Sequence, residues 1–298
     1  MNLANLNSLS TQRVKARFGL HPPLLAELLV VVWPELERRR TARLERRADR
    51  KRRLVAHAGR PRTVTPLPQV LMTLSYLRHN VQHEVVGALF GFSADTAENA
   101  FPAVVPVLRD LFPAENWDAE KQWRRGEPTW TPEAGDQVIL DSFESPVRRP
   151  SLPKQHKQVY AGKKNRHPLK TQLATDQDGE IRTLEAGQRG PHADRKLYQA
   201  APLPEPIAHK PRMGDKGSHS QEPPESTTPH TKPRGGELTA EQRAENKAIA
   251  RQRSVVEHAM RRITGFRILR DDYRLALGRF PMIASAVVGL LQFSRIAG

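Results

Sequence analysis

Apolar residues recur at helical spacing through the first third of the chain. The run that starts at Pro22 predicts a helix over residues 22–33, because proline is well tolerated in a first helical turn. A basic segment from Arg38 to Arg53 follows it. Two interpretations of that segment stay open: an exposed helix of mixed charge, or a contact to DNA phosphates. Another helix is predicted over residues 66–78, where the apolar positions again follow one face.

Residues 84–112 have the pattern of two helices joined by a short turn. The first is predicted over residues 84–90, Gly91 and Phe92 form the turn, and Ser93 caps the second helix. We expect the following residues to be buried where the helices meet: Val85, Val86, Leu89, Phe92, Ala97, Phe101, Val104 and Val105. This arrangement is typical of a helix-turn-helix spanning about residues 66–112.

A helix-turn-helix would place Thr96 and Asn99 of its second helix in a DNA groove. The same face holds two acids and no lysine or arginine, so a structural helical bundle is the alternative. Arg60 and Arg62, in a basic turn just before these helices, could enter a minor groove as an extended arm.

The pattern changes to strands after a proline-containing linker predicted over residues 113–134. A short apolar run, Gln137–Leu140, ends at Asp141. Such a run predicts a buried strand that brings an acid to the edge of a sheet. Two further strands are predicted over residues 167–176 and 180–186, joined by a tight turn.

The last third of the chain returns to helices. A short helix is predicted over residues 194–200, and a weakly patterned fourth strand leads to Asp215. After a polar loop, a capping box at Thr239 and Gln242 begins a long helix that continues to about Ile263. That helix carries two further residues of interest, one turn apart: Arg253 and Glu257.

Composition narrows the partner of this chain to a polyanion. The sequence has 48 lysines and arginines against 32 acids, a net charge of +16, which predicts binding to nucleic acid. The absence of cysteine excludes disulfides, thiol catalysis and cysteine-zinc sites, and the histidines lack the spacing of a zinc site. The apolar run over residues 282–291 is too short to span a bilayer, so we expect an intracellular protein with no membrane contact.

Three acids are placed where the predicted elements could bring them together: Asp141 after the first strand, Asp215 after the fourth, and Glu257 on the last long helix. That order of elements and acids is the order in a ribonuclease-H-like nuclease core. Cleavage of a phosphodiester by two divalent ions needs hard oxygen ligands, which suits Mg²⁺ or Mn²⁺. Each acid alone could be an ordinary turn or surface residue. Asp194 is the rival of Asp215, but it follows the third strand, so we expect a supporting role for it.

Several motifs together resemble one family, although each is weak by itself. They are Leu77-Arg78 with the helix-turn-helix after it, Val138-Ile139-Leu140-Asp141, Gly162-Lys163-Lys164 with His167 and Lys170, Gly190-Pro191-His192-Ala193-Asp194, Gly214-Asp215-Lys216-Gly217, Lys232-Pro233-Arg234-Gly235-Gly236-Glu237-Leu238, and Asn246 through Arg253 to Val256-Glu257-His258. In order and spacing the chain is similar to the DDE transposases of bacterial insertion sequences, in the branch with a Harbinger-like endonuclease domain. The resemblance covers about residues 60–275.

The resemblance implies roles for individual residues. Asp141, Asp215 and Glu257 match the three catalytic acids, which would bind two Mg²⁺ or Mn²⁺ ions. Arg253 matches an arginine one turn before the glutamate, which would orient that glutamate or contact phosphate. Three lysines match a basic strand expected to lie on DNA: Lys163, Lys164 and Lys170. The sequence departs from the usual family residues at three positions: Phe143, Ser218 and Thr264.

The sequence therefore predicts an all-α DNA-binding domain over residues 1–112, a ribonuclease-H-like α/β endonuclease domain over 135–275, and a carboxy-terminal helix over 276–298 that packs on the core. We expect a metal-dependent transposase that cuts and transfers double-stranded DNA as a homo-oligomer, in the cytoplasm and nucleoid of a bacterium. The alternative is a catalytically inactive DNA-binding protein derived from such an enzyme.

Overall fold

The computed structural model describes residues 9–51, 64–112, 137–148, 168–189, 210–214 and 227–296. The chain forms two compact units. The first, a helical unit, comprises residues 1–111 with 266–268 and 293–298. The second, built on a mixed sheet, comprises residues 112–265 with 269–292. A helical amino-terminal part followed by a mixed α/β part confirms the predicted fold class.

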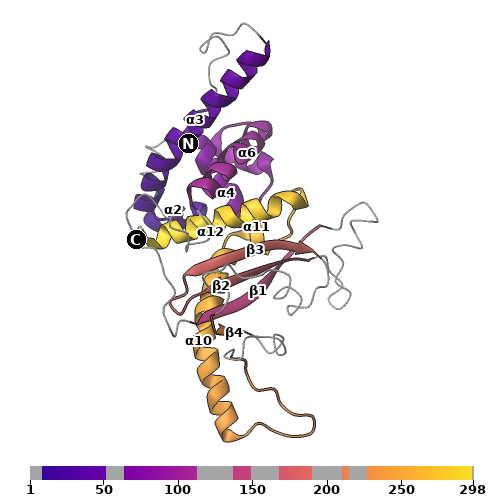
Figure 1. Ribbon diagram of the computed structural model, residues 1–298. Helices are drawn as coiled ribbons and strands as arrows, with labels where there is room; N and C mark the ends of the chain where they lie inside the picture. Colours follow the sequence, from indigo (N-terminus) through magenta and orange to yellow (C-terminus); the bar gives the residue numbers. More distant parts are fainter. Residues whose placement is uncertain are drawn as a thin grey trace. The chain divides into compact units, whose positions relative to one another are not determined.

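Five helices form the described amino-terminal part of the helical unit (Figure 1): α2 Thr11–Phe18, α3 Pro22–Lys51, α4 Pro66–His79, α5 His83–Phe90 and α6 Ala94–Leu111. Helix α4 is its centre, because Val70, Leu74 and Leu77 are fully buried. Helix α3 is one continuous helix of 30 residues with Pro34 inside it. The predicted helix at residues 22–33 and the start of the basic segment are therefore one element.

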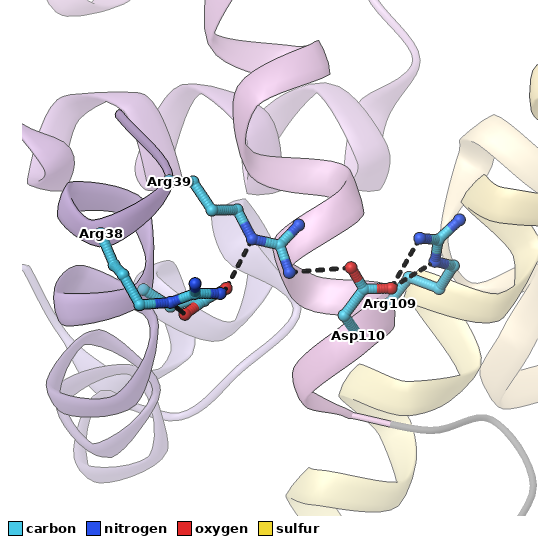
Figure 2. A network of polar contacts seen from close by, with 5 residues as sticks. Arg38, Arg39, Arg109 and Asp110 are labelled. Carbon is cyan, nitrogen blue, oxygen red and sulfur yellow. Dashed lines mark hydrogen bonds and ion pairs between the residues drawn. The ribbon is translucent and has the colours of Figure 1, made fainter. Parts of the chain in front are cut away.

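Arginines of the basic segment in α3 are held in ion pairs. Glu35 accepts hydrogen bonds from Arg38 and from Arg39, at 2.6 Å each. Arg39 also reaches Asp110 of α6 at 2.8 Å, and Asp110 is bonded by Arg109 (Figure 2). These pairs hold the pKa of Glu35 at about 2, through Arg38 first and then Arg39. Arg38 and Arg39 are therefore both paired with an acid of α3, and Arg39 also ties α3 to α6.

The predicted helix-turn-helix is formed by α5 and α6. Gly91 ends α5 in the left-handed conformation at φ 77°, and the Ser93 side chain accepts from the Thr96 amide at 3.2 Å. The predicted burial was wrong at Val85 and Leu89, which are 46% and 54% exposed. These two residues share one face of α5, because they are one turn apart, while the opposite face buries Val86 and Phe90.

A four-stranded mixed sheet forms the second unit, in the order β3-β2-β1-β4. Its strands are β1 Val138–Pro146, β2 Pro168–Thr175, β3 Ile181–Arg189 and β4 Arg212–Met213. Strands β1, β2 and β3 form an antiparallel meander, and β4 is parallel to β1. All four predicted strands are present. The predicted turn between β2 and β3 is closed by Asp176, which accepts from the Asp178 and Glu180 amides and from the Arg182 guanidinium.

Strand β1 is longer than predicted. The sequence was interpreted as a strand that stops at Asp141, but pairing with β2 continues to Pro146 opposite Pro168. Asp141 is therefore in the middle of a strand, opposite Leu173. The polar Ser142 and Glu144 concealed the second half of the strand, because only the run before Asp141 is continuously apolar. The acid comes from the body of the sheet and not from its edge.

Two long helices pack on this sheet. Helix α10, Ala240–Thr264, begins at the predicted capping box and buries Ile249, Val256, Ala259 and Ile263. Its amino-terminal turns extend beyond the sheet (Figure 1). After α11 (Arg267–Arg270) and a 3-10 turn, η3 (Leu277–Arg279), the chain forms α12, Phe280–Ile296. There the Gln292 side chain donates to the Ile181 carbonyl of β3 at 2.8 Å.

Helix α12 is a core helix. The segment Leu277–Ser294 is long and apolar enough to cross a membrane, in contrast to the shorter run considered in the sequence, but 56% of it is buried inside the protein. Phe280, Ile283 and Val287 are fully buried, and Gly289 lies so close to Phe112 that a Cβ atom would be 2.0 Å from its carbonyl oxygen. The apolar composition of α12 is thus explained by packing.

Candidate active site

Asp141 is held by contacts from both sides of its carboxylate. The Ser142 amide donates to Oδ1 at 2.8 Å, and the Arg253 guanidinium donates to Oδ2 at 3.2 Å. The Asp141 side chain is 18% exposed and the Arg253 side chain 14%. These two contacts fix the orientation of the carboxylate.

Arg253 comes from α10 and reaches the sheet because of the helix's buried stripe. Ile249 and Val256 pack inward from the turns on either side of it, which brings Arg253 to the margin of the helix–sheet contact. The resemblance implied that Arg253 would orient Glu257 or contact phosphate. The structure shows a contact of Arg253 with the first acid, Asp141, which is 112 residues away in the sequence. Arg253 therefore links β1 to the helix that carries Glu257.

Glu257 is exposed on α10, one turn beyond Arg253. Because Arg253 contacts Asp141, this spacing places the Glu257 backbone within one helical turn of a residue bonded to the first acid. The structure thus puts the first and third predicted acids on adjoining elements of one unit.

The second acid, Asp215, follows β4 by two residues and is outside the described residues. The strand before it is well defined: Val138 pairs with Arg212 and Ile139 with Met213, both in parallel register. Thr227 is hydrogen-bonded along the edge of β4 that faces away from β1. Its amide donates to the Arg212 carbonyl at 2.8 Å, and its carbonyl accepts from the Gly214 amide at 3.2 Å.

Several other predicted residues also lie outside the described part of the chain: Asp194, Lys163, Lys164, Arg60, Arg62 and Ser218. Within the described part, no three histidine or acidic side chains gather closely enough to hold a metal ion. The predicted site is therefore described at Asp141, Arg253 and Glu257 only. The donor type fits Mg²⁺ or Mn²⁺, since Asp141 and Glu257 offer carboxylate oxygens.

Lys170 does not present its charge at the surface. It lies in β2, where every residue is buried, and its amine is 3.9 Å from Glu144 of β1. A lysine that is buried and paired in this way does not reach a DNA phosphate, in contrast to the expectation for Lys170.

Two predicted DNA-contacting residues lie at the start of α6. The Thr96 hydroxyl lies 3.0 Å from that of Ser93, and exposed Asn99 donates to the Asp95 carbonyl at 2.7 Å.

Two of the departures from the family pattern are also described. Phe143 is half-buried in β1, opposite Thr171 of β2. The Thr264 hydroxyl donates to the Met260 carbonyl at 2.8 Å, at the end of α10. Neither Phe143 nor Thr264 takes part in the hydrogen bond between Asp141 and Arg253. Both departures are therefore compatible with the geometry of that pair.

Asn246 begins the last of the matching motifs, but its contact in the structure is not predicted by the sequence. Its side chain accepts from the His230 amide at 2.7 Å and donates to the His230 carbonyl at 3.1 Å. An asparagine in a helix gives no signal of such a contact, because its partner is backbone. A polar segment in an otherwise unpatterned loop, followed by a capping box, was the available clue.

Comparison with known proteins agrees with this geometry. A family described as DDE superfamily endonuclease matches residues 140–292, which includes β1 from its third residue and most of α12. The chain belongs to the DDE superfamily of endonucleases. A second family, the helix-turn-helix of DDE superfamily endonuclease, matches residues 63–114, which contain α4, α5 and α6. The predicted resemblance and the predicted enzyme class are thereby confirmed.

A curated relative is also similar over most of its length. The chain is 32% identical over 235 residues to a probable transposase for insertion sequence element IS702 from Microchaete diplosiphon, covering 76% of this chain and 79% of the relative. No solved structure is significantly similar to this DDE superfamily endonuclease. The family membership favours the helix-turn-helix over the alternative of a purely structural bundle.

Proposed function

We propose that this DDE superfamily endonuclease is a transposase that cuts double-stranded DNA and joins the cut end to a new site. The observation that carries the proposal is the 3.2 Å contact between Arg253 and Asp141, because it joins the strand of the first acid to the helix of the third. In the sequence, the second acid follows β4, which pairs in parallel with the strand of the first acid.

In the first step, a water oxygen attacks the phosphorus and the bond to the 3′ oxygen breaks, which leaves a 3′-hydroxyl and a 5′-phosphate. In the second step, the oxygen of that 3′-hydroxyl loses its proton and attacks a phosphorus of the target DNA; the target's bond to its own 3′ oxygen breaks, so the element end is joined to the target and a 3′-hydroxyl is released on the target strand. Two divalent ions held by Asp141, Asp215 and Glu257 would supply Lewis-acid activation of the nucleophile and stabilisation of the leaving oxygen. The chain's part is to orient these acids, and Arg253 does so for Asp141.

The helical unit would bind the DNA end. Asp95 and Asn99 are exposed near the start of α6, the second helix of the helix-turn-helix. The first turn of α6 has Asp95 and no arginine or lysine, so affinity must come from phosphate contacts made elsewhere in the protein. Two ends must be held together for transfer, and we therefore propose a homo-oligomer that acts on the nucleoid of a bacterium.

A cleavage assay on DNA that carries the element's own ends tests the proposal. Wild type should nick this DNA in Mg²⁺ or Mn²⁺ but not in EDTA. Asp141→Ala, Asp215→Ala and Glu257→Gln should each abolish nicking while retaining DNA binding and far-UV circular dichroism. Undiminished nicking by any one variant removes that residue from the site. Binding without nicking by wild type would favour the inactive, DNA-binding alternative.

A further inference from the structure

The loop before α10, residues 227–239, is polar, and hydrogen bonds hold it at two points. At its start, Thr227 is hydrogen-bonded to Arg212 of β4 and to Gly214 just after that strand. In its middle, both backbone groups of His230 are bonded by the Asn246 side chain, at 2.7 and 3.1 Å. The His230 ring is also paired with Glu245. A loop held in this way presents its next residues in a fixed position.

The residues that follow this attachment are cations facing solvent. Lys232 and Arg234 are both exposed, in a turn that Gly235 closes at φ 81°. Among the residues that the structure describes, neither Lys232 nor Arg234 forms an ion pair. Solvated cations without partners, on a backbone fixed by hydrogen bonds, are suited to phosphate groups, because little order is lost on binding.

Helix α10 extends this basic surface towards the active site. Arg243 and Lys247 are exposed one turn apart. With about 100° per residue, they lie about 40° and 80° around the helix from Glu257. The acids Glu241 and Glu245 are both about 160° around from Arg243. Positive charge is therefore segregated on the side of α10 that carries the third acid.

Arg243 is partly engaged but remains available. Its Nε donates to the Leu238 carbonyl at 3.1 Å, and its side chain is 64% exposed and 4.0 Å from Glu237. At that exposure such a pair adds little and is easily exchanged for a phosphate. Lys247 forms no ion pair with any residue in the described ranges.

We infer that Lys232, Arg234, Arg243 and Lys247 form a phosphate-binding surface for the duplex that flanks the cleaved bond, with Asn246 as the residue that positions the loop. Along the helix, Lys247 and Arg243 are about 15 and 21 Å from Glu257. At 3.4 Å per base pair, a duplex that follows α10 would meet this surface about four to six base pairs from the reacting phosphate. The inference rests on the proposed DNA-cleaving function and adds a surface outside the acid site.

Equilibrium binding of a duplex in EDTA, measured from 50 to 300 mM salt, tests the surface without cleavage. Lys232→Glu with Arg234→Glu should raise the Kd at least tenfold and reduce the salt slope by about two, since two phosphate contacts are lost. Arg148→Glu with Arg279→Glu is the matched control: both residues are exposed, and the net charge changes equally. The control should change the Kd less than threefold. Equal losses in both variants would overturn the inference.

Asn246→Ala separates position from charge. It removes both bonds to His230 without changing any cation. We expect a several-fold rise in Kd and faster tryptic cleavage after Arg234, and we expect bound duplex to slow that cleavage in wild type. A wild-type Kd in Asn246→Ala would contradict the positioning role. If wild type itself binds no duplex, the proposed function fails; if wild type binds and nicks but the loop variant matches its control, only this inference fails.

Discussion

The Arg253 guanidinium donates to Asp141 Oδ2 at 3.2 Å and so connects the middle of β1 with α10. Both side chains are mostly buried, at 14% and 18% exposure for Arg253 and Asp141, so water and salt screen this pair less than one on the surface. The pair fixes one carboxylate oxygen, and the other accepts a hydrogen bond from the Ser142 amide. Its removal is the first prediction.

Arg253→Ala should lower the DNA cleavage rate by about ten- to a hundredfold, equivalent to about 1.4–2.7 kcal/mol, because Asp141 loses its orienting partner. Arg253→Lys keeps the charge but not the planar geometry and should recover only part of the rate. Steady-state nicking assays give both rates, and the Mg²⁺ concentration at half-maximal rate reports the change at the metal site. Full activity in Arg253→Ala would show that the contact is only structural.

The network between α3 and α6 predicts a dependence of stability on pH. The pKa of Glu35 is lowered to about 2 in the folded state, so its stabilisation is fully present above about pH 4.5 and is lost as the pH falls towards 2. Glu35→Gln should therefore lower the free energy of unfolding by about 1 kcal/mol at pH 7. The difference from wild type should shrink at pH 3, as followed by urea unfolding. A constant difference across this range would contradict the assignment.

Packing of α12 on the second unit is tested at a glycine. A Cβ at Gly289 would be 2.0 Å from the Phe112 carbonyl oxygen, which is backbone and cannot rotate away. Gly289→Ala should therefore destabilise the protein by about 2–3 kcal/mol, as overpacking does. Gly278→Ala is the control, because no atom lies within 4 Å of its Cβ position. Thermal unfolding measures both, and equal melting temperatures would refute the tight approach.

The turn between β2 and β3 contains a buried ion pair, and removing one partner should lower the free energy of unfolding. Arg182 and Asp176 are 6% and 10% exposed, and Asp176 also accepts two backbone amides. Arg182→Met removes the cation and leaves a buried carboxylate, which should cost about 3 kcal/mol. Double substitution with Asp176→Ala tests the coupling in a mutant cycle by chemical unfolding. Independent, additive effects would show that the pair contributes nothing.

The sequence predicted the order of elements well, because local patterns determine it. The capping box at Thr239, the turn at Gly179 and the four strands depend on neighbouring residues, and each was found. Prediction from the sequence was wrong where strand pairing or side-chain burial depends on residues far away in the chain. The second half of β1 is polar but pairs with β2, and Leu89 is apolar but faces solvent on α5.

The candidate site was predicted in part for the same reason. The residue types at Asp141 and Glu257 and their order along the chain followed from pattern and resemblance. The partner of Arg253 did not, because 112 residues separate it from Asp141. The sequence predicts a DNA contact for Lys170 because it is a lysine in a basic motif, yet its side chain is buried beside Glu144. Only the three-dimensional arrangement distinguishes a buried cation from one that meets DNA.

The central claim is that Asp141, Asp215 and Glu257 hold divalent ions in one site. Cleavage of the polypeptide by hydroxyl radicals from bound Fe²⁺ tests this directly, since the radicals cut next to the metal. The account predicts cuts near residues 141, 215 and 257 in the wild-type protein, suppressed by excess Mg²⁺ and lost together in Asp141→Ala. Cuts at only one of these positions, or cuts at residues 215 and 257 that persist in Asp141→Ala, would contradict a shared site.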